Sequence, residues 1–288
     1  MMFRSAAGPP KIIRSLPGAL CLALAALVAG ATVATGADNW PSRMHIEYEV
    51  DFNGFNIGSF EFDSQAEEQS YTLTASARLS LLLGAFTWDG QTRSFGLIAK
   101  EATKPASFSF DFRSNLKAGS TTMDFADGAV TRITHLPPAV VNPATIPLRA
   151  DHLKGVVDPL SALMVLSRGA GSSPCERQIP VFDGRERFDL LFSYKGEMRV
   201  SEQLPSGQPA VAIVCKVRYL PIAGHKVDSE TQFMSANQQI EVALRPIPAA
   251  NVFVPYHITV PTLVGSASIM SKRVEIVSPG KPEIALLH

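Results

Sequence analysis

Residues 45–62, HIEYEVDFNGFNIGSFEF, alternate apolar and polar side chains on both sides of an Asn-Gly pair. Successive side chains of a β-strand point to opposite faces of a sheet, so this period of two indicates two half-buried strands. Asn53-Gly54 supplies the positive φ angles that a tight hairpin turn needs, and Gly58 predicts a bulge. The stretch is therefore predicted to form an antiparallel hairpin.

The same alternation recurs along most of the chain. Runs of this kind end in turn sequences such as Asp127-Gly128 and Asp183-Gly184. We expect an N-terminal strand set over about 44–135 and a C-terminal set over about 178–277. The number of these strand-like runs is larger than the number of strands in a small closed barrel. The predicted fold class is all-β, a large curved or incomplete antiparallel β-barrel that is open or spiral.

One segment, about 158–168, interrupts the strand pattern and is predicted to be a helix. Asp158 is a good N-cap, Pro159 suits the first helical position, and Gly169 suits the C-cap. The residues between them are apolar on nearly all sides, so we expect one short helix buried against the concave side of the sheet. No flexible polar linker separates the two strand sets, which favours a single β-rich domain over 38–288.

The first 37 residues have the pattern of a secretory signal peptide. Arg4, Lys11 and Arg14 form a basic leader without acidic residues, the apolar stretch 18–31 follows, and small residues precede Asp38. A retained membrane anchor is the alternative, but an anchor needs about 20 apolar residues. We expect cleavage, a periplasmic location and no stable membrane span after processing.

Removal of this leader changes the charge of the chain. Without Arg4, Lys11 and Arg14, 23 of the 26 basic residues remain against 26 acidic ones, a net charge of −3. No basic stripe is present, and the cluster Arg185-Glu186-Arg187 is interrupted by an acid. Nucleic acid is therefore not an expected partner.

The cysteines form an even pair once Cys21 is removed with the leader. Cys175 and Cys215 remain in a chain that is sent to an oxidising compartment, which predicts a disulfide. Two buried free thiols are the alternative. Cys215 lies in an alternating run, residues 211–219, and shares a face with its apolar residues.

Catalytic and metal-binding patterns are weak in this sequence. It contains no G-x-S-x-G elbow, no S-x-x-K at a helix start and no phosphate-binding glycine loop. The six histidines are scattered without metal-ligand spacing. No metal and no cofactor are expected, although a triad of distant residues stays an open alternative.

Three groups of residues are candidates for ligand or partner binding. Arg185 and Arg187 follow the Asp183-Gly184 turn on the same face and could offer forked donors to a carboxylate or phosphate, the alternative being a hairpin with a solvated strand face. His225, in a predicted turn, could bind or titrate near neutral pH. The third group is Phe108, Phe110 and Phe112, whose rings would lie on one face of a strand. They would either bind an apolar ligand or pack in the hydrophobic core.

Several runs resemble a family of exported proteobacterial envelope proteins known as domain of unknown function 3108. The runs are DPLSAL at 158–163, PVFDGRERFDL at 180–190, and CKVRY with PIAGH between 215 and 225, and residues 48–58 resemble the family's opening hairpin. The resemblance implies export and a β-rich fold, and it implies no particular activity.

These observations leave three classes of function. The first is a non-catalytic envelope protein that binds a lipid-like apolar ligand, or a segment of an envelope partner, on its curved sheet. The second is a periplasmic hydrolase or modifying enzyme. The third is a structural scaffold whose sheet edges pair with another envelope protein. The oligomeric state is not indicated.

Overall fold

The computed structural model describes residues 40–288 except 68, 100–101, 140–141 and 170–172. The predicted signal peptide, 1–37, lies outside the described residues. Ala37–His288 form one compact unit, which contains every described residue. None of the helices in the described part of the chain is long and apolar enough to cross a membrane.

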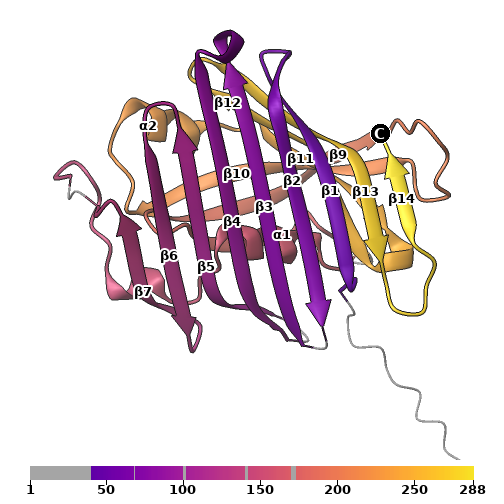
Figure 1. Ribbon diagram of the computed structural model, residues 1–288, viewed down its shortest axis with the longest axis horizontal. Helices are drawn as coiled ribbons and strands as arrows, with labels where there is room; N and C mark the ends of the chain where they lie inside the picture. The colour runs from indigo at the N-terminus through magenta and orange to yellow at the C-terminus, as the bar shows by residue number, and fades with distance from the viewer. Residues whose placement is uncertain (1–39, 68, 100–101, 140–141, 170–172) are drawn as a thin grey trace, which may run out of the picture. The chain divides into compact units, whose positions relative to one another are not determined.

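The first half of the sheet is a meander in which the strands follow one another (Figure 1). Its strands are β1 (Arg43–Phe52), β2 (Phe55–Glu67), β3 (Ser70–Leu81), β4 (Phe86–Ile98), β5 (Thr103–Ser114), β6 (Ala118–Ala126) and β7 (Ala129–Leu136). A short 3₁₀ helix, η1 (Leu82–Gly84), connects β3 to β4.

The second half begins with helical turns and continues as another meander. The chain passes through η2 (Ala150–Leu153) and α1 (Pro159–Ser167) before it enters the strands. These are β8 (Gln178–Phe182), β9 (Arg187–Arg199), β10 (Val211–Ala223), β11 (Ile240–Ile247), β12 (Val252–Thr262), β13 (Gly265–Val277) and β14 (Ile284–Leu287). The helix α2 (Ser229–Ala236) connects β10 to β11, and η3 (Pro248–Ala250) connects β11 to β12.

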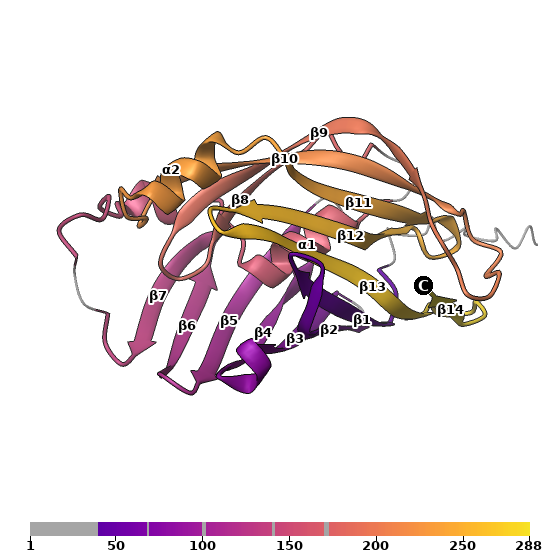
Figure 2. The ribbon, with the colours of Figure 1, turned by 90° about the horizontal axis from the view of Figure 1, so that it is seen from above.

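Pairing of β1 with β13 joins the two meanders into one antiparallel sheet, which contains 14 strands in the described part of the chain. The pairing places Ile46 opposite Val274. β14 pairs with the distal part of β13, around Val274. The edge strands β7 and β8 are not paired with each other within the described residues. The sheet therefore curves without closing (Figure 2), which confirms the predicted open antiparallel barrel.

The connecting segment between the halves lies along this open seam. Lys154 forms a bridge with Ala129 on β7, and Val157 forms a parallel bridge with Val181 on β8. Thr145, earlier in the same segment, forms a bridge with Lys226, which follows β10. The proline-rich loop thus occupies the gap that backbone pairing leaves open.

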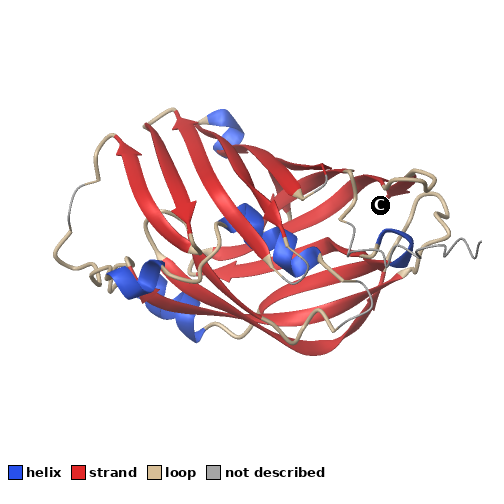
Figure 3. Cartoon of the chain, turned by 90° about the horizontal axis from the view of Figure 1, so that it is seen from below, coloured by secondary structure: helices blue, strands red, loops and turns tan. Residues whose placement is uncertain are grey.

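The helix α1 lies between the two layers of the curved sheet (Figure 3) and is buried there, as predicted. Leu160 and Met164 pack into a core cluster shared with the first meander, whereas Ala162 and Leu166 pack into a second cluster shared with the second meander. An apolar surface on all sides is what such a position requires.

The N-terminus of α1 carries a buried polar cluster. Asp158 Oδ1 accepts hydrogen bonds from the backbone N–H groups of Leu160 and Ser161, each at 3.0 Å. Its Oδ2 accepts a hydrogen bond from Ser94 Oγ at 2.9 Å, and Tyr71 Oη lies 2.7 Å from Ser161 Oγ. Burial raises the pKa of Asp158. These bonds attach the helix to β3 and β4.

The predicted disulfide is present between Cys175 and Cys215, whose Cα atoms lie 5.2 Å apart. Both residues are fully buried in the second core cluster.

Two elements were not predicted from the sequence. α2 presents no apolar periodicity, and none of its residues is fully buried, although Asp228 caps its N-terminus by accepting a hydrogen bond from Thr231 N. β14 is short, follows a turn, and pairs only with β13 among the described strands. Both were missed because local pattern is weak where tertiary contacts decide the structure.

Candidate functional site

A strip of aromatic side chains follows β4 and β5 on the face of the sheet that faces α1. Ser94 identifies this face, because its hydroxyl donates to Asp158 at the start of the helix. Phe108 is the cross-strand partner of Ser94 and shares its face. Phe110 and Phe112 follow at intervals of two and therefore lie on the same face, away from α1 along the strand.

Trp88 completes this strip, which we call the aromatic strip (Trp88, Phe110 and Phe112). The rings of Trp88 and Phe110 lie 6.2 Å apart, and those of Phe110 and Phe112 are stacked at 5.8 Å. The indole lies directly over Gly90, where a Cβ atom would come within 2.2 Å of the ring. All three side chains are half-buried, whereas Phe108 is buried in the core. The strip is therefore accessible apolar surface on the concave face.

Aromatic side chains also occupy the concave face of the second meander. Tyr219 follows Cys215 and Val217 at intervals of two on β10, so it shares their inward face. Its ring contacts Phe188 on β9, with centroids 5.2 Å apart. Both side chains are half-buried against the second core cluster.

A cleft of about 770 Å³, which we call the seam cleft, lies where the two halves meet near these rings. It is bounded by the end of β7, the turn between β8 and β9, the proline-rich loop and α2. Its apolar lining comes from Ala139, Pro143, Ile146, Pro147, Leu148, Tyr219 and Met234. Its polar lining comes from His135, Asn142, Thr145, Arg185, Glu186, Lys226, Asp228, Glu230 and Thr231.

The turn between β8 and β9 lines this cleft and lies against the first meander. Gly184 has a φ of +100°, and a Cβ atom there would lie 2.4 Å from Thr121 Cγ2 on β6. Asp183 Oδ1 accepts hydrogen bonds from Arg185 N and Glu186 N at 2.8 and 2.7 Å, which fixes the turn. Glycine is required at this position both for its conformation and for the close approach.

Charges of both signs line the seam cleft. Burial and the nearby Arg185 lower the pKa of His135, whose Nδ1 lies 3.0 Å from Thr121 Oγ1. Tyr219 donates a hydrogen bond of 3.0 Å to Glu186, and burial together with this carboxylate raises the pKa of the phenol. At neutral pH, His135 and Tyr219 are therefore uncharged, and Arg185 supplies a positive charge to the cleft.

The residues singled out from the sequence are only partly brought together. Arg185 lines the seam cleft, but Arg187 turns away and donates to Phe188 O and to Asp189. His225 lies between two lining residues, and its Nδ1 is buried without a hydrogen-bond partner among the described residues. Trp88, Tyr219 and His135 were not predicted as site residues, because their proximity depends on strand order.

Catalytic arrangements are sparse in the described part of the chain. No cluster of three or more metal-ligating side chains occurs among the described residues. His257 Nε2 lies 2.7 Å from Ser268 Oγ on neighbouring strands, and burial lowers the pKa of His257. No carboxylate among the described residues hydrogen-bonds to this histidine, so the pair lacks the third member that orients a catalytic base.

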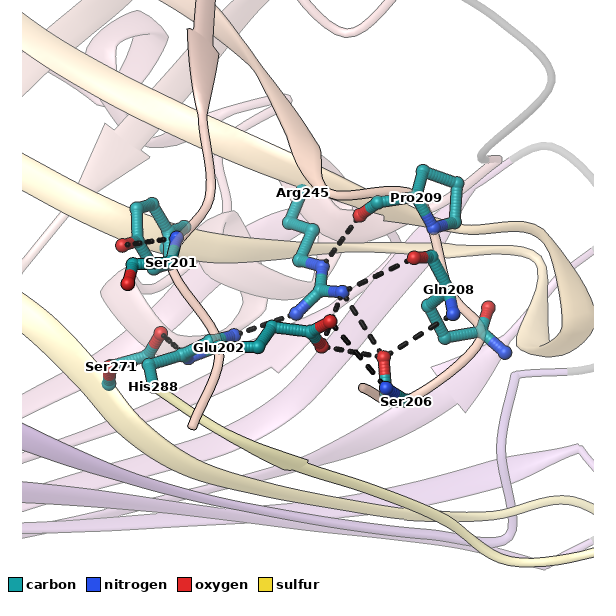
Figure 4. Close-up of polar contacts among 9 residues, drawn as sticks. Ser201, Glu202, Ser206, Gln208, Pro209, Arg245, Ser271 and His288 are labelled. Carbon is teal, nitrogen blue, oxygen red and sulfur yellow. Dashed lines mark hydrogen bonds and ion pairs between the residues drawn. The ribbon is translucent and has the colours of Figure 1, made fainter. Parts of the chain in front are cut away.

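A second polar cluster surrounds Arg245 on β11 (Figure 4). The guanidinium is fully buried and donates 2.9 and 2.7 Å hydrogen bonds to Pro209 O and Glu202 Oε1. Its Nη1 lies 2.8 Å from His288 Nε2, and His288 Nδ1 lies 2.8 Å from Ser271 Oγ. The cluster joins the loop between β9 and β10 to β11, β13 and the end of β14, so we interpret it as a structural clamp.

The clamp makes stability depend on pH. Burial and the neighbouring Arg245 lower the pKa of His288 to about 4. An unfolded histidine binds its proton near pH 6.5, so between about 6.5 and 4 the unfolded chain binds more protons than the folded one. Stability is therefore lost as the pH falls through this range.

We expect this contribution to be about 1–2 kcal/mol, because solvent screens the partly exposed imidazole. Urea unfolding of the wild type and His288→Gln at pH 7 and pH 4.5 measures it. The wild type should lose more stability on acidification than His288→Gln, and an equal loss in both would contradict the assignment.

Comparisons with known proteins agree with this fold. A search of the solved structures finds the "Crystal Structure of Beta-barrel-like Protein of Domain of Unknown Function DUF1849 from Brucella abortus", with 12% identity and a TM-score of 0.50. The match covers 83% of this chain and 98% of that one, and at this identity it shows the fold alone. A search of curated protein sequences finds no match. The model of the family described as "Protein of unknown function (DUF3108)" matches residues 47–272, so the chain belongs to this family.

Proposed function

We propose that this protein is a non-catalytic binding protein of the cell envelope that holds the apolar chain of a lipid-like molecule on its concave face. The observation that carries the proposal is the aromatic strip. Trp88 contacts Phe110 at a tilted angle, Phe110 stacks on Phe112, and all three rings face the interior of the curved sheet and stay half exposed. Rings in this position offer a ligand apolar contact area whose burial is favourable.

The seam cleft supports the same function. Its apolar residues continue the concave surface through Tyr219 and Met234, while Arg185 and Lys226 could pair with an anionic head group. Concave apolar sites with few polar groups are the usual form of small-molecule sites. The predicted signal peptide and the buried disulfide support an envelope location.

The two tryptophans allow a direct test. Trp88 belongs to the aromatic strip, whereas Trp40 is buried elsewhere and donates to Ser64 Oγ. Dibromostearate, a fatty acid that quenches nearby indoles, is the probe. We expect it to quench the fluorescence of Trp40→Phe, which retains Trp88, and to leave Trp88→Phe nearly unquenched.

Affinity for the same probe should depend on the strip. In the Trp40→Phe background, Phe110→Ala and Phe112→Ala should each weaken binding about tenfold, the loss expected for a ring that contacts the ligand. Phe95→Ala, on the opposite face of β4, is the matched control and should leave affinity unchanged. Equal quenching of both tryptophan variants, or equal effects of Phe95 and Phe110, would refute the proposal.

Hydrolysis is the second candidate, and the pair of His257 and Ser268 is the observation that favours it. A fluorophosphonate probe labels activated serines. Our proposal expects no labelling of Ser268, and stoichiometric labelling would favour the hydrolase instead.

A further inference from the structure

Four strand connections meet at one end of the sheet. They join β1 to β2, β3 to β4, β5 to β6, and β12 to β13. Because neighbouring strands are antiparallel and β1 pairs with β13, these four connections lie at the same strand ends and on contiguous strands. The β8–β9 turn and the β10–β11 connection lie at the corresponding ends of strands farther along the sheet, where they line the seam cleft. Figure 1 shows the four connections along the upper edge. We call these four connections the rim.

The tips of the rim expose large apolar side chains. Phe55, Leu82, Leu116, Leu263 and Val264 are 76, 82, 79, 53 and 80% exposed. Turn tips are normally occupied by Gly, Asn, Asp, Ser or Pro, which suit the backbone conformation and water. Single exposed apolar residues need no explanation, but their concentration on neighbouring tips at one end indicates a binding surface.

The same segments are nearly devoid of charge. Residues 52–60, 79–88 and 258–271 contain no Asp, Glu, Lys or Arg, and residues 114–123 contain only Lys117. At the opposite end of the first meander, residues 67–69, 99–102 and 127–128 contain Glu67, Glu68, Lys100, Glu101 and Asp127. A surface that is apolar, lacks acids and carries one lysine complements an interface with apolar chains and anionic head groups.

Hydrogen bonds hold neighbouring tips together and satisfy their backbone groups. Asn53 N donates to Ser266 O and Asn53 Oδ1 accepts from Ser266 N, both at 2.9 Å. Asn115 Nδ2 donates to Ala85 O at 2.7 Å. These bonds reduce the number of unpaired backbone groups that the tips would carry into a less polar medium.

We propose that the rim docks on the surface of a lipid bilayer, with the apolar tips entering the interfacial region and Lys117 facing anionic head groups. The tips are separate protrusions from four connections, a form that suits a deformable lipid surface. The aromatic strip ends at this rim, since Trp88 is the cross-strand partner of Ser114 at the turn between β5 and β6. Docking does not depend on the proposed function, and it would place the strip beside a source of lipid.

Sedimentation with vesicles of phosphatidylethanolamine and phosphatidylglycerol tests this inference. The protein is the compact unit Ala37–His288, which omits the apolar leader. The rim variant combines Phe55→Ser, Leu82→Ser, Leu116→Ser and Val264→Ser. The control variant combines Phe95→Ser, Leu97→Ser, Tyr194→Ser and Leu204→Ser, which also removes exposed apolar side chains but leaves the rim intact.

We expect the rim variant to lower the partition coefficient at least tenfold and the control variant to change it less than twofold, with unchanged circular dichroism in both. Lys117→Gln should weaken binding to anionic vesicles about fivefold at low salt, and binding to neutral phosphatidylcholine vesicles should stay unchanged. The inference would be overturned if the wild type did not sediment with the vesicles, or if the rim and control variants lost vesicle binding equally. The inference would also be overturned if the wild type forms a dimer, does not bind vesicles, and becomes monomeric in the rim variant. The rim would then bind a second copy of the chain. Dibromostearate quenching is measured without vesicles. Failure of the proposed lipid binding and failure of membrane docking are therefore distinguished.

Discussion

Replacement of Cys175 and Cys215 together by alanine is expected to lower the free energy of unfolding by about 4 kcal/mol, because the disulfide closes a long loop. The two residues are 40 positions apart, and the bond limits the conformations of the unfolded chain between them. In the folded chain it joins the segment before the edge strand β8 to β10, and β9 lies between these two strands. Both sulfur atoms lie within the second core cluster.

Urea unfolding of the double variant and of the wild type, with and without a reductant, separates the contribution of the cross-link from that of the cysteine side chains. The reduced wild type retains both side chains and loses only the cross-link, so it should account for most of the change. The midpoint should fall while β-sheet circular dichroism at low urea is retained. A loss below about 1 kcal/mol in both samples would contradict the expected role of the cross-link.

The sequence predicted those features of the fold that depend on local pattern. The alternation at 45–62 and the turn at Asn53-Gly54 correspond to β1 and β2, which pair through Phe52 and Phe55. The cap at Asp158 and the apolar helix after it correspond to α1. These predictions succeed because strand period and helix caps are properties of neighbouring residues.

The features of the site that sequence could not predict depend on contacts between distant residues. Arg185 and Arg187 are two positions apart and were expected to act together, but Arg185 lies in the turn, where strand alternation does not apply. Arg187 lies in β9 and pairs with Asp189. The seam cleft has no local signal either, since the edges of both meanders and the connecting loop form it jointly.

Arg245 is the clearest example, and it leads to the second large effect. On sequence it is one cation in a strand, yet its partners come from residues 202–209 and from His288. Arg245→Met is expected to lower the free energy of unfolding by about 3–5 kcal/mol, the cost of leaving a buried charge without its partner. The charge left without its partner would be the carboxylate of Glu202. Although burial opposes it, hydrogen bonds from Ser206 and Arg245 hold the pKa of Glu202 below its usual value.

Thermal and urea unfolding at pH 7 measure the effect, with Arg273→Met as the control. Arg273 forms an exposed ion pair with Glu275, so its loss should change stability by less than about 1 kcal/mol. Adding Glu202→Leu to Arg245→Met removes the unpaired carboxylate and should recover part of the loss. If the double variant is as unstable as the sum of the single variants, the two residues are not coupled, and the clamp is explained by packing of the arginine side chain alone.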